Sequence, residues 1–162
     1  MWDSFNTYDQ GHQNSFETLC NQLFERYLSR EYPNSIDEFK VINGAGGDGG
    51  IEAYGILSNG DFIAIQSKWL KQALDTNEIK QIRKSIIGAL DIRPNIKEYI
   101  ICIPHNVSSI KIGRGNKPTI NSEDVRIKKF EKEIKESFLN VKITWWFEQT
   151  ILNELQLPEN EG

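Results

Sequence analysis

Side chains suited to metal and phosphate chemistry gather within residues 46–69, GGDGGIEAYGILSNGDFIAIQSKW. Asp48 stands in a glycine-rich stretch and Glu52 follows it, while Gln66 and Lys68 end an apolar run. Carboxylate and amide oxygens are ligands for a hard divalent cation such as Mg²⁺. An ammonium group can stabilise an anionic phosphorane or orient the attacking water. The residue types therefore predict a site for a divalent cation and a phosphate group.

A β-hairpin would bring these residues into one small space. The apolar runs 51–57 and 62–69 are joined by Ser-Asn-Gly-Asp, and Asn-Gly between apolar runs is the strongest short-range hairpin signal. The glycines before the first run, by contrast, continue neither a helix nor a strand comfortably. We expect a loop followed by two paired strands.

The length of the hairpin loop decides which side chains share a face. Strand side chains alternate, so Gln66 and Lys68 point the same way. A regular two-residue loop would leave Glu52 on the opposite face. We therefore expect a three-residue loop, or a bulge at Gly55, which places Glu52 on the face of Gln66.

The elements around the hairpin predict an α/β domain. Strands joined through a helix are usually parallel with a right-handed crossover, so the expected fold is a mixed central sheet flanked by helices. The expected elements are a helix from Ser15, strands at 37–42, 51–57 and 62–69, a helix opened by Asp75, a strand at 98–104, a helix at 122–138, a strand at 141–147 and a helix at 148–157.

Length, composition and net charge limit the classes to which this protein can belong. A chain of 162 residues is long enough for one domain with a sizeable core. No apolar run approaches the roughly 20 residues needed to span a bilayer, and the first residues lack the pattern of a secretory signal, so we expect a cytoplasmic protein without a membrane segment. Cys20 and Cys102 fit buried, reduced thiols. Because the net charge is -4, binding to nucleic acid would need a local basic surface.

The hairpin and its flanking motifs resemble the PD-(D/E)-x-K restriction-endonuclease-like nucleases. GGDGGIE followed by IQSK is similar to the Mrr-like branch, in which Gln often occupies the third motif position. The resemblance covers roughly residues 16–104, within a single domain whose core spans about 14–104 and whose helix–strand–helix extension spans about 121–157. It implies a restriction-endonuclease-like fold and a Mg²⁺-dependent DNA endonuclease, with Mn²⁺ able to substitute and double-stranded DNA as the expected substrate.

The resemblance also implies roles for individual residues. Asp48, Glu52, Gln66 and the Ser67 carbonyl would hold the metal, and Lys68 would assist attack of water on the phosphate. Mrr-like members often carry aspartate where Glu52 stands. Either Glu52 or Asp48 is therefore the main metal ligand, and the sequence leaves both open.

Two charged residues fall on apolar helix faces. Glu17 lies within the apolar arc of the first helix, where the family often places an acidic residue of the metal site; the alternative is a capping box formed with Asn14. Arg83 lies within the apolar arc of the second helix, where it could contact a phosphate or Glu17. Its alternative is a side chain that snorkels to solvent.

Basic residues supply the candidate contacts to DNA. The segment from His105 to Asn121 has no hydrophobic period and reads as a long loop, a length that is often functional. Its run KIGRGNKP could clamp phosphates, or it could be merely solvated. The candidate DNA-binding residues are Lys71, Arg83, Lys111, Arg114 and Lys117.

Two other classes compete with a nuclease. One is a catalytically weak DNA-binding or assembly module, because a neutral Gln66 amide holds Mg²⁺ less strongly than a carboxylate. The other is a nucleotide-binding domain that uses GAGGDGG as a phosphate cradle, which is disfavoured because that stretch leads into a strand rather than a helix. The resemblance further implies a homo-oligomer and regulation by, or fusion to, a sensor or NTPase module, as in bacterial antiviral STAND NTPases.

Overall fold

The computed structural model describes residues 11–42, 50–107 and 122–157. Within them, helices and strands follow the order predicted from the sequence. The elements are α1 (Gly11–Glu31), β1 (Ile36–Val41), β2 (Ala53–Leu57), β3 (Phe62–Ser67), α2 (Thr76–Ile92), β4 (Ile96–Cys102), α3 (Glu123–Ser137), β5 (Lys142–Trp146) and α4 (Glu148–Leu155).

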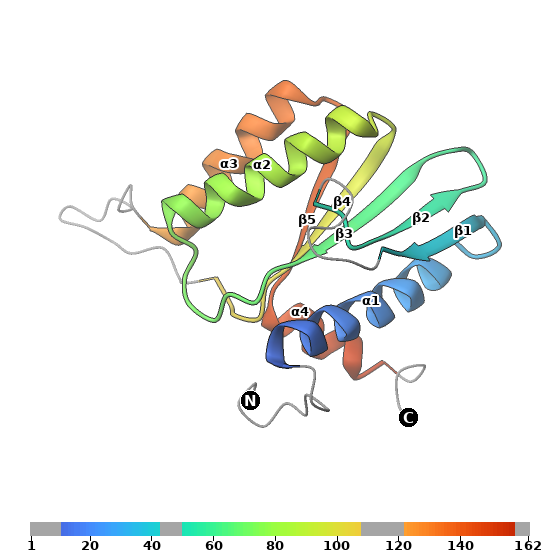
Figure 1. The fold of residues 1–162 in the computed structure, drawn as a ribbon, viewed down its shortest axis with the longest axis horizontal. Coiled ribbons are helices and arrows are strands. Elements are labelled where there is room, and N and C mark those ends of the chain that lie inside the picture. The colour runs from blue at the N-terminus through green and yellow to red at the C-terminus, as the bar shows by residue number, and fades with distance from the viewer. Residues whose placement is uncertain (1–10, 43–49, 108–121, 158–162) are drawn as a thin grey trace.

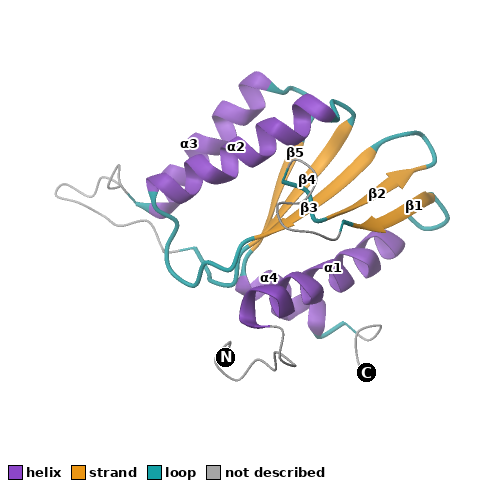
Figure 2. Cartoon of the chain, in the orientation of Figure 1, coloured by secondary structure: helices purple, strands orange, loops and turns teal. Residues whose placement is uncertain are grey.

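The strands form one mixed sheet in the order β1-β2-β3-β4-β5. β1, β2 and β3 pair antiparallel as a meander, whereas β3–β4 and β4–β5 pair parallel. Each parallel pair is joined through a helix, which confirms the predicted α/β architecture. Helices α2 and α3 cover one face of the sheet, and α1 and α4 cover the other (Figures 1 and 2).

Two apolar cores follow from this layering. On the α2–α3 face, Tyr99 and Ile101 of β4 pack with the apolar stripes of both helices. On the α1 face, Ile63 and Ile65 of β3 pack with side chains such as Phe16. Every residue of β3 is buried, so the strand that ends in Gln66 and Ser67 is covered on both faces.

The hairpin has the three-residue loop expected from the sequence. Ala53 pairs with Ile65 and Ile56 with Phe62. Beyond them, the Leu57 N–H donates to the Asp61 carbonyl at 2.9 Å, which leaves residues 58–60 as the loop. Gly60 has a φ of +88°, a conformation that favours glycine.

The helix starts were only partly predictable. Asp75 caps α2 by accepting from the Glu78 N–H at 2.7 Å, as expected. Ser122 caps α3, a cap that was not predicted. Helix α1, however, begins at Gly11. Asn14 is therefore inside the helix, where its carbonyl accepts from the Thr18 hydroxyl. The alternative of a capping box between Asn14 and Glu17 is wrong.

The remaining fold-level expectations concern cysteines and membrane segments. Cys20 and Cys102 are both buried and free. None of the helices in the described ranges is long and apolar enough to cross a membrane.

Candidate functional site

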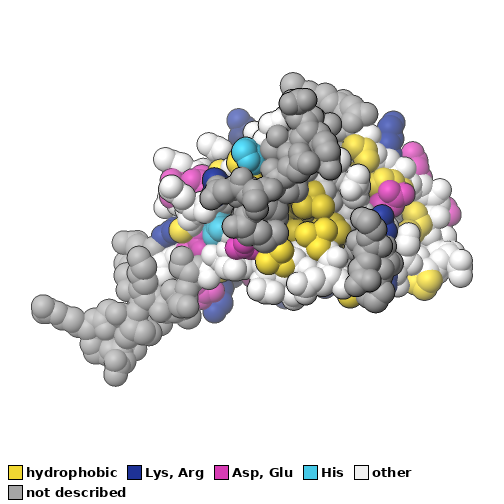
Figure 3. Space-filling view, turned by 90° about the horizontal axis from the view of Figure 1, so that it is seen from below, with side chains coloured by type: hydrophobic (Ala, Val, Ile, Leu, Met, Phe, Trp, Pro, Cys, Tyr) yellow, Lys and Arg dark blue, Asp and Glu magenta, His cyan; other side chains and the backbone are white. Residues whose placement is uncertain are grey.

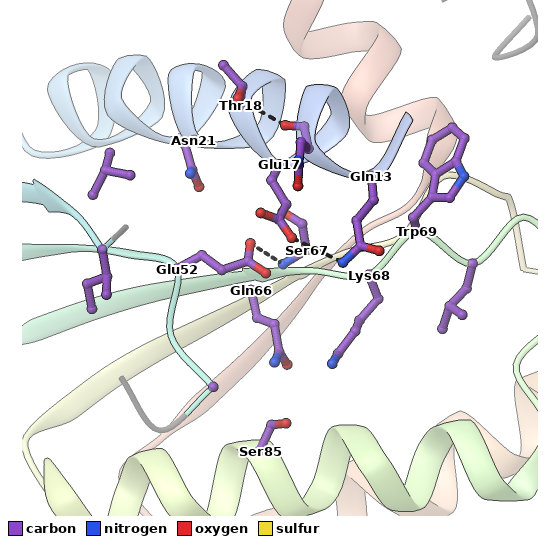
Figure 4. A pocket seen from close by; sticks show the side chains of 15 residues that line it. Gln13, Glu17, Thr18, Asn21, Glu52, Gln66, Ser67, Lys68, Trp69 and Ser85 are labelled. Atoms are coloured by element: carbon purple, nitrogen blue, oxygen red, sulfur yellow. Dashed lines mark hydrogen bonds between the residues drawn. The ribbon is translucent and has the colours of Figure 1, made fainter. Parts of the chain in front are cut away.

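A pocket of about 550 Å³ opens where β3 ends, between α1 and α2 (Figure 4). It is lined by polar side chains from both helices and by the end of the hairpin. The lining residues are Gln13, Asn14, Glu17, Thr18, Asn21, Val41, Ile42, Gly50, Glu52, Gln66, Ser67, Lys68, Trp69, Leu70 and Ser85. The structure thus brings together Glu17, Glu52, Gln66, Ser67 and Lys68, which were all predicted as site residues.

Gln66 and Lys68 extend from the end of β3 toward α2, where Ser85 lies (Figure 4). The parallel pairing with β4 continues one residue past the strand, because the Lys68 N–H donates to the Cys102 carbonyl at 2.9 Å. This bond fixes the backbone that carries the ammonium group. Trp69 instead faces α1, where it contacts the rings of His12 and Phe16. The predicted alternation of the strand is confirmed.

Glu52 reaches the pocket through a local irregularity rather than by regular alternation. Its N–H donates to the carbonyl of Ile65, the residue that also pairs with Ala53. Ile51 and Ala53, which would share a face in a regular strand, pack in opposite cores. The alternation therefore breaks at Glu52, and its Oε2 accepts a hydrogen bond of 2.9 Å from the Ser67 N–H.

Glu17 approaches the same place from α1. Its Oε1 accepts from Gln13 Nε2 at 3.4 Å, and its carboxyl group lies on the α1 side of Glu52 (Figure 4). Burial and the Glu17 carboxylate raise the pKa of Glu52 to about 7, against the opposing effects of the Ser67 N–H and the Lys68 ammonium. Two carboxyl groups in a partly desolvated space favour either a proton or a cation between them.

Tyr99 contacts two residues that line the pocket, and it was missed in the sequence. Its ring is fully buried, and its hydroxyl lies 2.6 Å from the Gly50 carbonyl oxygen and 3.3 Å from the amide oxygen Oε1 of Gln66. Burial and the nearby Glu52 carboxyl group raise the pKa of Tyr99, so the phenol keeps its proton. The one available signal was a hydroxyl-bearing residue directly before the apolar run 100–103.

The oxygen groups of this pocket match the preferences of a hard cation. The described residues offer the Glu17 and Glu52 carboxylates, the Gln66 amide and the Ser67 carbonyl. In the described ranges, however, no group of three or more His, Cys, Asp or Glu side chains is placed to hold a metal. Such a cation would therefore depend on the amide and carbonyl oxygens as well. Asp48, the alternative main ligand, lies outside the described residues.

The predicted DNA-binding residues are not all at the pocket. Arg83 forms an ion pair with Glu133 of α3, so the structure places it between α2 and α3 and not beside Glu17. Lys71 Nζ lies 5.9 Å from the centre of the Trp69 ring, next to the pocket wall. Lys111, Arg114 and Lys117 lie outside the described residues.

Charges are mixed over the face formed by α1 and α4. Figure 3 shows this face from below, with basic and acidic side chains interspersed where the described residues are visible. Pairs such as Arg30 with Glu154, at 2.8 Å, contribute to this pattern. The visible face therefore resembles an ordinary solvated surface more than a phosphate-binding stripe.

Comparisons with known proteins give little further guidance. No protein-family model matches the chain, and no curated protein matches it. One solved structure, described as the crystal structure of a repair endonuclease from Pyrococcus abyssi, aligns with 80% of this chain at a TM-score of 0.38 and 13% sequence identity. The alignment covers 44% of that protein. At this level of similarity, the comparison assigns no activity to the chain.

Proposed function

We propose that the pocket at the end of β3 is the active site of a metal-dependent endonuclease that hydrolyses phosphodiester bonds in DNA. The observation that carries this proposal is that Glu17 and Glu52 line one pocket beside Lys68, where burial and the Glu17 carboxylate raise the pKa of Glu52 to about 7. Paired acids and a neighbouring lysine at one strand end fit a cation and an anionic phosphate together.

Each residue has a distinct part in this proposal. Glu17, Glu52, the Gln66 amide oxygen and the Ser67 carbonyl would hold Mg²⁺ or Mn²⁺. Such a cation neutralises phosphate charge and lowers the pKa of bound water toward 7. Lys68 stands on the phosphate side, where its ammonium group stabilises the negative charge that develops as water attacks.

The choice of DNA as substrate, double-stranded in particular, rests on the resemblance of the GGDGGIE and IQSK motifs to Mrr-like nucleases. So does a role as the effector of a bacterial defence protein, with a sensor or NTPase module controlling its assembly. The pocket itself supports the general chemistry, because Lys68 and two carboxyl groups suit any phosphodiester.

A DNA-binding or assembly module is the second candidate. It is favoured by Gln66, whose neutral amide replaces a carboxylate and leaves the described residues with two acidic side chains at the pocket. Such a module would retain the fold and bind DNA without cutting it.

Incubation of the chain with supercoiled plasmid separates the two candidates. Parallel reactions contain Mg²⁺, Mn²⁺ or EDTA, and each is divided between an agarose assay for cleavage and a gel-shift assay for binding. Cleavage that needs the metal supports the nuclease. A shift without cleavage under every metal condition supports the binding module and contradicts the nuclease.

A further inference from the structure

The hydroxyl of Tyr99 faces two groups but has one proton to give. The Gly50 carbonyl oxygen, 2.6 Å away, can only accept a hydrogen bond. The second neighbour is the amide oxygen of Gln66, whose Oε1 lies 3.3 Å away. The Gly50 carbonyl is the nearer neighbour and can only accept, so the phenolic proton of Tyr99 points toward it. The Tyr99 oxygen therefore presents only its lone pairs to Gln66.

These lone pairs call for a donor, whereas the Gln66 atom that faces Tyr99 in the structure is the amide oxygen, an acceptor. The oxygen and nitrogen of a glutamine amide are distinguished by their hydrogen-bond partners, not by shape. Gln66 is 3% exposed, so a lone pair set against another lone pair would be costly there. The favourable arrangement is therefore the one in which the amide is rotated by half a turn from that placement, with its nitrogen toward Tyr99 and its oxygen toward the pocket.

We infer that Tyr99 is a positioning residue that orients the Gln66 amide, so that the amide oxygen is presented to a divalent cation. The inference rests on the proposed function for its cation, while the orientation itself follows from hydrogen bonding alone. It also accounts for glutamine at this position. A carboxylate at position 66 would place an oxygen against a hydroxyl whose proton is already engaged by Gly50.

The same hydroxyl joins three parts of the site. Tyr99 lies on β4, Gln66 on β3, and Gly50 stands before β2 with a φ of +87°. A Cβ at Gly50 would lie 2.7 Å from Ser85 Cβ of α2, so the carbonyl that receives the Tyr99 proton has little freedom to move. The donor and its acceptor are thus both held by the fold.

Nuclear magnetic resonance of the wild-type chain without metal tests the orientation directly. The inference predicts nuclear Overhauser contacts from the Gln66 side-chain NH₂ protons to the Tyr99 ring, and slow exchange of one of those protons. Contacts of the NH₂ protons to pocket residues such as Ser85, with none to Tyr99, would overturn it. This readout does not depend on any nuclease activity.

The Tyr99→Phe variant tests the consequence for metal binding, with Tyr54→Phe as the matched control. Tyr54 is also buried on the α2–α3 face but does not line the pocket. In Tyr99→Phe, Mn²⁺ binding followed by calorimetry should weaken about fivefold, the effect of losing one modest hydrogen bond, and Tyr54→Phe should bind as the wild type does.

Equal Mn²⁺ affinity in all three proteins would overturn the positioning role. If the wild type itself binds no Mn²⁺, the proposed function fails, while the measured amide orientation still decides the first part of the inference.

Discussion

Glu52 has a carboxyl group whose environment differs strongly from that of a free side chain in water. Its carboxyl group has a pKa of about 7, against an ordinary value of 4.5, because it is buried and lies near Glu17. A raised acid pKa means that the folded state binds a proton more tightly than the unfolded state does. Without a cation, Glu52 therefore stabilises the fold below about pH 4.5, and this contribution is lost as the pH rises through 7.

Glu52→Gln should change the free energy of unfolding by an amount that depends on pH. At pH 8 in EDTA the variant should be more stable than the wild type, by at most about 3 kcal/mol, because it removes a charge that the metal-free pocket disfavours. The difference should shrink steadily toward pH 4.5. Urea unfolding at both pH values measures it, and a difference that does not change with pH would contradict the assigned environment of Glu52.

Gln66→Glu should lower the stability of the metal-free protein. The added carboxylate would face the Tyr99 oxygen in a site that is nearly closed to water, so the variant should lose about 1–3 kcal/mol of stability in EDTA. Saturating Mn²⁺ should recover part of this loss, because a cation compensates the new charge. Thermal unfolding with and without Mn²⁺ is the measurement. An unchanged melting temperature in EDTA would show that Tyr99 does not restrict the residue at position 66.

Alanine substitutions at Gly50 and Gly60 separate the cost of backbone strain from the cost of close packing between elements. Gly50 and Gly60 both have positive φ, at +87° and +88°, but only Gly50 would place a Cβ against Ser85, since no atom lies within 4 Å of a Cβ at Gly60. Gly60→Ala should cost about 1 kcal/mol from backbone strain alone. Gly50→Ala should cost clearly more, because α2 must also move. Denaturant titration compares them, and equal costs would mean that the contact with α2 is not tight.

Much of the element order was predictable, for identifiable reasons. Apolar periods marked the helices and strands, Asn59-Gly60 marked the hairpin, and Asp75 with Glu78 marked the start of α2. The early start of α1 was missed because its first turn is polar and carries no apolar period. Long-range pairings such as Arg83 with Glu133 could not be predicted, since they depend on how α2 and α3 pack together.

The site itself was predictable in composition but not in geometry. Gln66 and Lys68 share a face because a strand alternates, and any strand would do the same. The irregularity at Glu52 leaves no mark in the sequence, as it shifts one residue without an obvious glycine or proline at that position. Tyr99 was missed because a buried aromatic residue in an apolar strand ordinarily indicates core packing.

The described part of the chain offers one candidate active site, whereas cutting both strands of a duplex calls for two. We therefore expect the active form to be a homodimer or a larger assembly. Light scattering across a range of concentrations, with and without DNA, measures this. A strict monomer that nonetheless makes double-strand breaks in a single event would contradict the prediction.

Lys68 is proposed to act on a phosphate in the pocket, and single-turnover plasmid cleavage with Mg²⁺ measures this role. Lys68→Ala should lose at least about 100-fold in cleavage rate, corresponding to about 3 kcal/mol of lost electrostatic stabilisation. Lys97→Ala is the control, because Lys97 is an exposed lysine paired with Asp61 and lies outside the pocket lining. We expect Lys97→Ala to cleave like the wild type and Lys68→Ala to cleave far more slowly. Equal cleavage by all three proteins would contradict it.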